Sequence, residues 1–247
     1  MLPYVEAPSL ALGPVELNAF PVLVAVATVV GFEVCVRRAP ALGFDRDEAG
    51  RILVWTIAGG FVSSHLVAIA ITDPAAYWNE PLRFLRLWEG MSSMGGVLGG
   101  IAVGVFAMRR AGMDGEAMLR FVDGVAFAFP FAWIFGRAAC ALAHDHPGIA
   151  SDHFLAVAFP DGPRFDLGLL ELFFTLGIAA LFAGLARRPR PSPFYLGLFF
   201  TLYGPVRFGL DTLRVADTRW AGLTFAQYAC VALTVTGVVL LARLRSR

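Results

Sequence analysis

The chain has 247 residues, of which 57% are hydrophobic and only 16% are charged. A soluble domain usually carries about 25% charged residues, so the composition argues against a soluble globular protein. The formal net charge of +1 gives no field that would attract nucleic acid. Cys35, Cys140 and Cys230 are too far apart for a disulfide framework or a C-x-x-C metal site.

Seven apolar blocks follow one another along the chain, each close to the ~20 residues that a helix needs to cross a bilayer. Blocks of this length exclude the short alternating strands of a membrane barrel, and in lipid only helices then satisfy every backbone group. The sequence therefore predicts an all-α polytopic membrane protein, forming one transmembrane domain over residues 1–247. The predicted spans are roughly 15–36, 51–72, 92–109, 121–143, 166–186, 194–213 and 223–242.

The arginines in the links between these spans are unevenly distributed. Links 1–2, 3–4 and 5–6 and the C-terminal tail hold thirteen of them, and the links on the opposite side hold five. Because cytoplasmic loops carry the excess of basic residues, the N-terminus is predicted to be periplasmic and the C-terminus cytoplasmic. The outer link 73–91 interleaves Trp78 and Trp88 with Arg83 and Arg86. We expect it to lie in the membrane interface, as an anchor or as a substrate gate.

Four charged residues stand out within the predicted spans, where a charge at the bilayer centre costs at least about 2.5–3.5 kcal/mol. Arg137 lies in the fourth span, Glu171 in the fifth, and Arg207 and Asp211 one helical turn apart in the sixth. Two interpretations stay open. The residues form two internal ion pairs, Arg137–Glu171 and Arg207–Asp211, or the arginines bind an anionic lipid headgroup, since guanidinium groups bind phosphate oxygens bidentately.

The fourth span ends in His144-Asp145-His146, followed by Pro147-Gly148. We expect no metal and no cofactor here, because neighbouring helix positions face apart and no cysteine or carboxylate cluster completes a ligand shell. One interpretation is acid–base chemistry by His144 or His146, with Asp145 orienting the ring. The other is a polar helix end in solvent, with Pro147-Gly148 making the turn.

The second and third spans also carry unusual residues. His65 is expected to be a hydrogen-bonded core histidine. Gly99 and Gly100 are expected to let the third span pack closely against another helix. Gly95 and Gly96, near the start of that span, serve either packing or the approach of a headgroup to exposed N–H groups.

Taken in order, these residues resemble the prolipoprotein diacylglyceryl transferase family over nearly the whole chain. The resemblance rests on Leu12-Gly13-Pro14-Val15, on Arg86-Leu87-Trp88-Glu89-Gly90-Met91-Ser92 with Gly95-Gly96, on Gly136-Arg137 with Gly148 eleven residues later, on Glu171, and on Tyr203-Gly204-Pro205-Val206-Arg207-Phe208 with Asp211 and Arg214.

The resemblance implies a multi-pass protein of the bacterial inner membrane, with phosphatidylglycerol as donor and the signal peptide of a lipoprotein precursor as acceptor. The diacylglyceryl group would move to a cysteine thiol and glycerol phosphate would leave. Arg137 and Arg207 would stabilise the leaving phosphate. The residues expected to bind substrate are Gly95, Gly96, Gly148, Glu171, Tyr203, Asp211 and Arg214.

The sequence also departs from the family pattern. Met94 stands where the family has the histidine before Gly-Gly, and Ala139-Cys140 where it has Gly-Asn. Further departures are Phe20, His65, Gly168 and Leu170. Since Met94 cannot act as a base, we expect His144 or His146, oriented by Asp145, or the arginine field alone, to activate the thiol. The departures leave three alternatives open: a different acceptor, transfer of the phosphoglycerol headgroup, or non-catalytic phospholipid binding.

Overall fold

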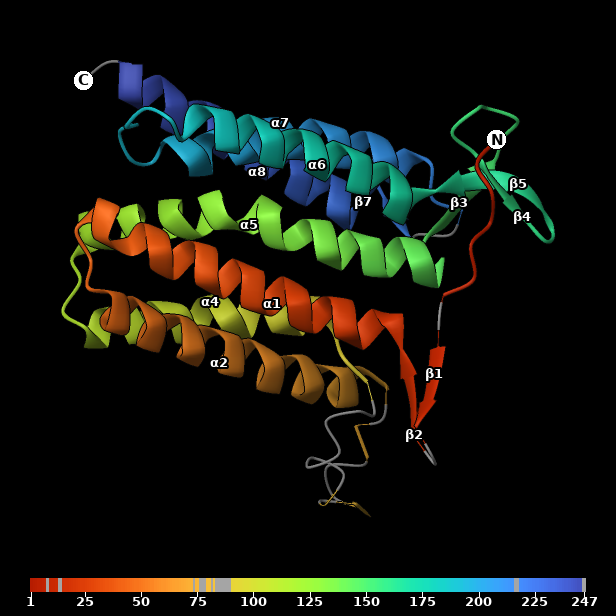
Figure 1. Cartoon of the computed structure of the whole chain (residues 1–247), viewed down its shortest axis with the longest axis horizontal. Helices are drawn as coiled ribbons and strands as arrows, with labels where there is room; N and C mark the ends of the chain where they lie inside the picture. Colours follow the sequence, from red (N-terminus) through yellow and green to blue (C-terminus); the bar gives the residue numbers. More distant parts are fainter. Residues whose placement is uncertain are drawn as a thin grey trace. The chain divides into compact units, whose positions relative to one another are not determined.

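The computed structural model describes residues 1–7, 9–12, 15–72, 74–75, 79–80, 82, 90–215 and 218–245. Most of the predicted interfacial segment 73–91, including both tryptophans and both arginines, lies outside this part of the chain, as does Gly13-Pro14. The described residues form seven long α-helices (Figure 1). These are α1 Ala19–Arg38, α2 Arg46–Thr72, α4 Ser93–Arg110, α5 Gly115–Ala143, α6 Leu167–Leu185, α7 Phe194–Thr212 and α8 Phe225–Arg245.

Five of these seven helices are long and apolar enough to cross a membrane. They are α1 with the short 3-10 helix η1 (Ala39–Leu42) that follows it, α2, α5, α6 and α8. The chain is therefore a polytopic membrane protein, as predicted. α4 and α7 are not among these five helices; α4 ends on Arg109 and Arg110, and α7 carries Arg207 and Asp211.

The boundaries differ from the prediction mainly at the N-terminus. The first span was expected from residue 15, but Val15–Asn18 forms strand β2, which pairs antiparallel with β1, Ser9–Leu12. Helix α1 begins only at Ala19. At the start of α2, the Asp45 carboxylate accepts hydrogen bonds from the backbone N–H groups of Glu48 and Asp47. These bonds favour the charged carboxylate and lower the pKa of Asp45.

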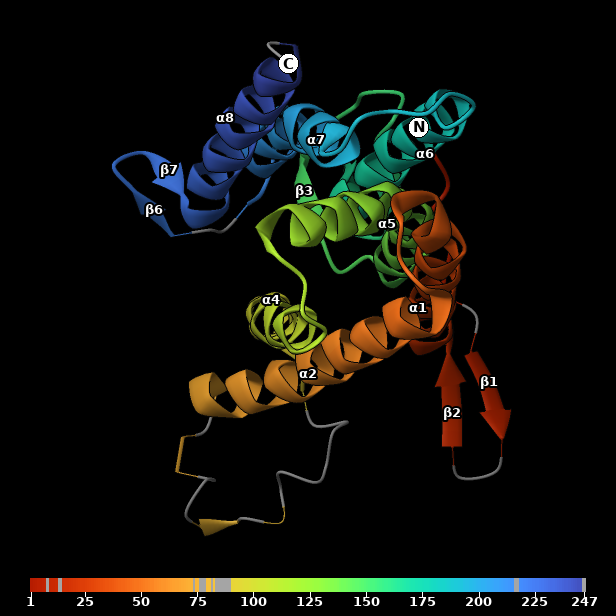
Figure 2. The same ribbon diagram turned by 90° about the vertical axis from the view of Figure 1, so that its left-hand side faces the viewer.

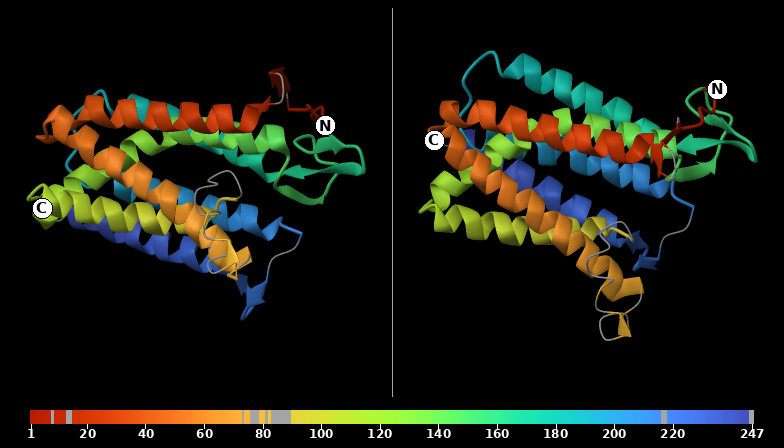
Figure 3. Two further views of the ribbon diagram at one scale, coloured as in Figure 1. Left: turned by 90° about the horizontal axis from the view of Figure 1, so that it is seen from below. Right: turned by 60° about the horizontal axis from the view of Figure 1, so that its bottom comes forward.

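The helices are not the whole fold, since short strands occupy several links. β3 (Pro147–Ala150), β4 (Val157–Phe159) and β5 (Gly162–Asp166) form an antiparallel sheet in the order β3-β5-β4. β6 (Arg219–Trp220) and β7 (Leu223–Thr224) form a hairpin before α8. Figure 3 shows the three-stranded sheet where α5 ends and α6 begins, with the N-terminus beside it. The backbone of Leu2 bridges to Val157 of β4.

The chain folds into two compact units, one formed by Met1–Cys35 with Val122–Arg247 and the other by Val36–Phe121. In the first unit, aromatic and aliphatic side chains of α5, α6 and α7 form a buried cluster. Its fully packed members are Phe127, Ile178, Phe182, Tyr195 and Phe199. This core fixes the three helices that carry the intramembrane charges. The prediction of a single domain stays a prediction.

In the second unit, α2 and α4 pack against each other (Figure 2). A Cβ added to Gly99 would lie 2.0 Å from the Ser63 hydroxyl oxygen, and one added to Gly95 would lie 2.5 Å from Cβ of Val67. Close approach of the helices therefore requires glycine at both positions. His65 is 1% exposed and its Nδ1 lies 3.2 Å from the carbonyl oxygen of Gly90. The expectation of a hydrogen-bonded core histidine is confirmed.

Candidate active site

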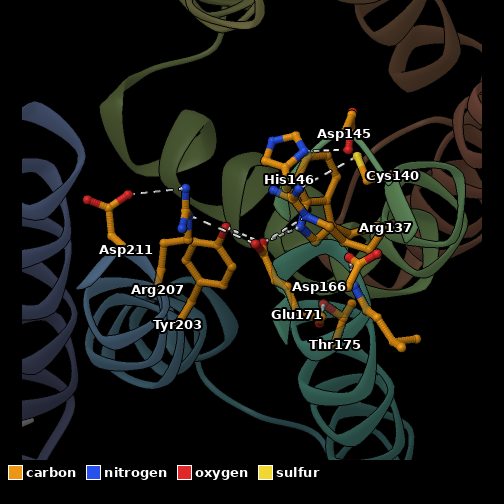
Figure 4. Close-up of polar contacts among 12 residues, drawn as sticks. Arg137, Cys140, Asp145, His146, Asp166, Glu171, Thr175, Tyr203, Arg207 and Asp211 are labelled. Atoms are coloured by element: carbon orange, nitrogen blue, oxygen red, sulfur yellow. Dashed lines mark hydrogen bonds and ion pairs between the residues drawn. The ribbon is translucent and has the colours of Figure 1, made fainter. Parts of the chain in front are cut away.

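Three helices of the first unit bring the intramembrane charges together. Arg137 comes from α5, Glu171 from the first turns of α6, and Arg207 from α7. Arg137 Nε lies 2.9 Å from Glu171 Oε1, and Arg207 Nε lies 3.9 Å from Glu171 Oε2. Figure 4 shows the carboxylate between the two guanidinium groups. The two arginines therefore face one another across a single acid.

Glu171 is 2% exposed, and neighbouring donors hold its carboxylate in place. The Tyr203 hydroxyl donates to Oε1 at 2.7 Å, and the indole N–H of Trp133 donates to the same oxygen at 3.1 Å. A buried carboxylate is tolerated only when it is paired and hydrogen-bonded, and both conditions are met here. Glu171 can therefore act as a fixed anchor that sets the positions of both arginines.

A second acid lies on the other side of Arg207. Asp211, one turn further along α7, places Oδ1 3.6 Å from Arg207 Nη2 and 3.9 Å from Arg214 Nη1. Its other oxygen accepts a hydrogen bond from the Thr224 hydroxyl. Thr224 is itself fixed at the start of α8, because its N–H donates to Gln227 Oε1 and its hydroxyl oxygen accepts from the Gln227 N–H. Asp211 therefore links α7 to α8.

This geometry is compatible with both interpretations of the intramembrane charges, as internal ion pairs and as a site for a phosphate. The expected pairs Arg137–Glu171 and Arg207–Asp211 are confirmed as ion pairs. The contacts of Arg207 with its acids, at 3.6 and 3.9 Å, are longer than hydrogen bonds. A guanidinium group has five N–H donors, so the observed pairing leaves donors that could bind a phosphate.

Arg137 has further contacts that fix its orientation. Its Cζ lies 4.5 Å from the centre of the Trp133 ring, a cation–π contact within one turn of α5. Its Nη1 donates to the Cys140 sulfur at 3.7 Å. Its Nε is buried and has no hydrogen bond of good geometry, although it lies within ion-pair distance of Glu171. The Glu171 carboxylate is therefore the anion that this buried donor faces.

The two histidines at the end of α5 differ in environment. His144 has Nδ1 2.6 Å from the buried carboxylate of Asp166 and Nε2 3.1 Å from the carbonyl oxygen of Val5. Its ring stacks on Tyr4 at 4.1 Å between centroids. Both ring nitrogens are thus engaged, and the ring links the N-terminal segment, through Nε2, to the end of β5, through Nδ1. His146 contacts Asp145 through Nδ1 and is partly exposed, with 28% of its side chain accessible.

The remaining predicted site residues fall into two groups. Gly148 forms a backbone bridge with Arg214, and a Cβ there would lie 3.1 Å from the carbonyl oxygen of Leu213. It therefore joins the sheet to the end of α7. Gly95 and Gly96 belong to the second unit, where a Cβ on Gly96 would have ordinary contact distances, 3.5 Å at the nearest.

Several residues of the site were not predicted from the sequence. Trp133 precedes Arg137 by four residues and so shares its helix face, a spacing that could have identified it. Thr224 and Gln227 have the spacing of a helix capping box. Cys140 was noted as a departure from the family pattern, but nothing in the sequence placed it beside Asp145 and His146.

Comparisons with known proteins agree with the motifs. Residues 8–243 match the family described as prolipoprotein diacylglyceryl transferase. A protein of Ectopseudomonas mendocina named phosphatidylglycerol–prolipoprotein diacylglyceryl transferase is 28% identical over 98% of this chain and 96% of its own length. A protein of the same name from Nitratidesulfovibrio vulgaris is 30% identical over 98% of this chain and 95% of its own length. The chain therefore belongs to the prolipoprotein diacylglyceryl transferase family.

Proposed function

We propose that this chain is a phosphatidylglycerol–prolipoprotein diacylglyceryl transferase of the bacterial inner membrane. The main support for the proposal is that Arg137 and Arg207 lie on two helices around one buried carboxylate, in a chain of this family. The proposal includes seven spans, in which α4 and α7 also cross the membrane. It also includes a periplasmic N-terminus and a cytoplasmic C-terminus, supported by the arginine distribution.

In the proposed reaction, the acceptor sulfur attacks phosphatidylglycerol at the carbon of the diacylated glycerol that is bonded to the phosphate oxygen. An S–C bond forms, the C–O bond to phosphate breaks, and glycerol phosphate leaves with the electron pair. Negative charge grows on the phosphate oxygens, so preorganised cations lower the barrier. Arg137 and Arg207 supply these cations, and Glu171 and Tyr203 hold them in position. Asp211 offsets part of the Arg207 charge on the side away from Glu171, and Arg214 in turn offsets part of the Asp211 charge.

The proposed reaction also needs the acceptor thiol to be deprotonated, since the thiolate is the nucleophile. Met94 offers no titratable group. Both ring nitrogens of His144 already have partners, which favours His146 with Asp145 as the group that activates the thiol. The donor glycerol and acceptor peptide would then meet near Gly148. Gly95 and Gly96 of the other unit are proposed to bind substrate on the resemblance to the family alone.

A transfer assay tests this proposal. The purified protein is reconstituted in vesicles with phosphatidylglycerol and a model lipobox peptide, and the peptide mass is followed. We expect a diacylglyceryl adduct on the cysteine peptide, no adduct on a peptide with serine in its place, and loss of the adduct in Arg137→Ala and Arg207→Ala. The released product identifies the reaction, because diacylglyceryl transfer leaves glycerol phosphate and headgroup transfer leaves diacylglycerol.

Two outcomes would contradict the proposal. Bound but unreacted lipid, with no adduct under any condition, favours the non-catalytic alternative. Full transfer by both arginine variants would reduce Arg137 and Arg207 to structural ion pairs. Arg120→Ala is a matched control, since Arg120 pairs with Glu116 on an exposed surface at the start of α5.

A further inference from the structure

Three side chains with metal-ligating atoms meet where α5 ends. One ligand atom each from Cys140, Asp145 and His146 lies within 4.8 Å of the other two. Figure 4 shows the Cys140 sulfur next to the Asp145 carboxylate, with the His146 ring beside it. From the sequence, no cysteine was expected to complete a ligand shell here, and neighbouring helix positions were expected to face apart. That spacing does not apply, because α5 ends at Ala143 and His144 adopts a positive φ of 49°.

The reversal at His144 is stabilised independently of the cluster. Its ring is held by Asp166, Val5 and Tyr4, so the chain after it is directed back over the last turn of α5. Asp145 and His146 thereby come to lie over Cys140, five and six residues earlier. The cluster is thus a consequence of a fixed turn. It is also accessible, since 38% of the Asp145 side chain and 28% of the His146 side chain are exposed.

We propose that Cys140, Asp145 and His146 bind a divalent cation of the zinc class, with a fourth position open to the acceptor thiolate. The second part rests on the proposed function. A thiolate, an imidazole and a carboxylate form a ligand set that suits Zn²⁺ or Co²⁺, whereas Mg²⁺ and Ca²⁺ prefer oxygen ligands alone. Three protein ligands with one open position are typical of catalytic rather than structural zinc sites.

The geometry requires only a small adjustment. Ligand bonds of about 2.0–2.3 Å give ligand separations of roughly 3.3–3.8 Å in a tetrahedral site. The present separations of up to 4.8 Å would therefore close by about 1 Å, which rotation of the exposed Asp145 and partly exposed His146 side chains allows. The Arg137 Nη1 contact with the sulfur would then be an outer-shell hydrogen bond to a thiolate. Glu171 offsets the charge of Arg137, which reduces the electrostatic repulsion between the guanidinium group and a bound cation.

The site would replace the base that the sequence lacks at Met94. An acceptor thiol that binds the cation gives up its proton to solvent water, and its sulfur becomes a bound thiolate. The sulfur then forms the S–C bond as the C–O bond to phosphate breaks, and the phosphate oxygen keeps the electron pair beside Arg137. His146 would act as a ligand in this scheme.

Cobalt binding tests the proposal without turnover. The full-length protein, purified with a tag that contains no histidine and stripped of metal, is titrated with Co²⁺ in nanodiscs. We expect one equivalent to bind, with visible d–d bands and a thiolate-to-cobalt charge-transfer band. Cys140→Ser should abolish the charge-transfer band, and Asp145→Asn and His146→Ala should each weaken Co²⁺ binding at least about tenfold. Cys230→Ser and His153→Ala, which change a buried thiol and a loop histidine elsewhere, should bind as the unmodified protein does.

A lipobox peptide tests the open position. Adding the cysteine peptide to the cobalt-loaded protein should intensify the charge-transfer band, and the serine peptide should leave it unchanged. Absence of stoichiometric Co²⁺ binding, or a charge-transfer band that survives in Cys140→Ser, would overturn the metal site. An unchanged spectrum with the cysteine peptide would overturn the open position. A cobalt site in a protein that shows no transfer would instead count against the proposed function.

Discussion

Replacing Glu171 by glutamine should strongly destabilise the protein, because this carboxylate is shared by two buried guanidinium groups. At an effective dielectric constant of about 20, a unit charge pair attracts by roughly 6 kcal/mol at the 2.9 Å contact with Arg137 and by roughly 4 kcal/mol at the 3.9 Å contact with Arg207. Desolvation offsets much of this attraction. Removing one partner of a buried pair typically costs about 3–5 kcal/mol.

Glutamine has the same shape as glutamate and can still accept hydrogen bonds from Tyr203 and Trp133, so the substitution removes the charge and little else. For a chain of this size, each kcal/mol of lost stability lowers the melting temperature by about 2–4 °C. The substitution should therefore lower the melting temperature by about 6–20 °C. The measurement is thermal unfolding in nanodiscs of zwitterionic lipid. Glu116→Gln is the control, because Glu116 pairs with Arg120 at 3.2 Å on an exposed surface and should change stability by less than about 1 kcal/mol.

Phosphatidylglycerol should restore much of the stability lost in Glu171→Gln. With the carboxylate charge removed, the lipid phosphate becomes the anion that the two arginines bind, and a ligand at about 100 times its Kd adds roughly 2.7 kcal/mol. The same lipid should stabilise the unmodified protein less, since Glu171 competes for the same guanidinium groups. Equal small shifts in Glu171→Gln and Glu116→Gln, with no extra effect of phosphatidylglycerol, would refute this account of the site.

Three further substitutions test the surroundings of the arginines. His144→Ala should increase hydrogen exchange at residues 1–7 while transfer activity persists, because His144 holds Val5; unchanged protection would contradict this role. His146→Ala should leave that protection intact and lower transfer about tenfold or more, and full transfer would remove His146 from thiol activation. Tyr203→Phe should cost about 1.5–3 kcal/mol in denaturant unfolding, since it removes a 2.7 Å hydrogen bond to a buried carboxylate. An unchanged unfolding free energy would show that Glu171 is held by its other partners.

The helices could be predicted from the sequence because continuous apolar blocks of about 20 residues have few other interpretations in a bilayer. The predicted span 194–213 compares with α7 at Phe194–Thr212, and 166–186 with α6 at Leu167–Leu185. The strands were missed because each has only two to five residues, too few for an alternating pattern. Val15–Asn18 was included in the first span because its backbone pairing with β1 leaves no mark on the composition.

The charged centre was predictable for a different reason. Arg137, Glu171, Arg207 and Asp211 are conspicuous in apolar helices, so their functional or structural importance follows from the cost of burying them. That Glu171 lies between both arginines depends on how α5, α6 and α7 pack, which sequence spacing within one helix cannot reveal. The cluster around Cys140 depends on the backbone turn at His144, a residue type that only occasionally adopts a positive φ.

If Arg137 and Arg207 bind one phosphate between them, their substitutions should not act independently on phosphatidylglycerol binding, and a double-mutant cycle measures this. Lipid affinity is measured for the unmodified protein, Arg137→Ala, Arg207→Ala and the double variant, with phosphatidylcholine as the reference lipid. A shared phosphate predicts that the second substitution costs much less than the first, with an interaction energy of about 0.5–3 kcal/mol. Strictly additive losses, or full affinity in either single variant, would show that the two arginines do not hold the same phosphate.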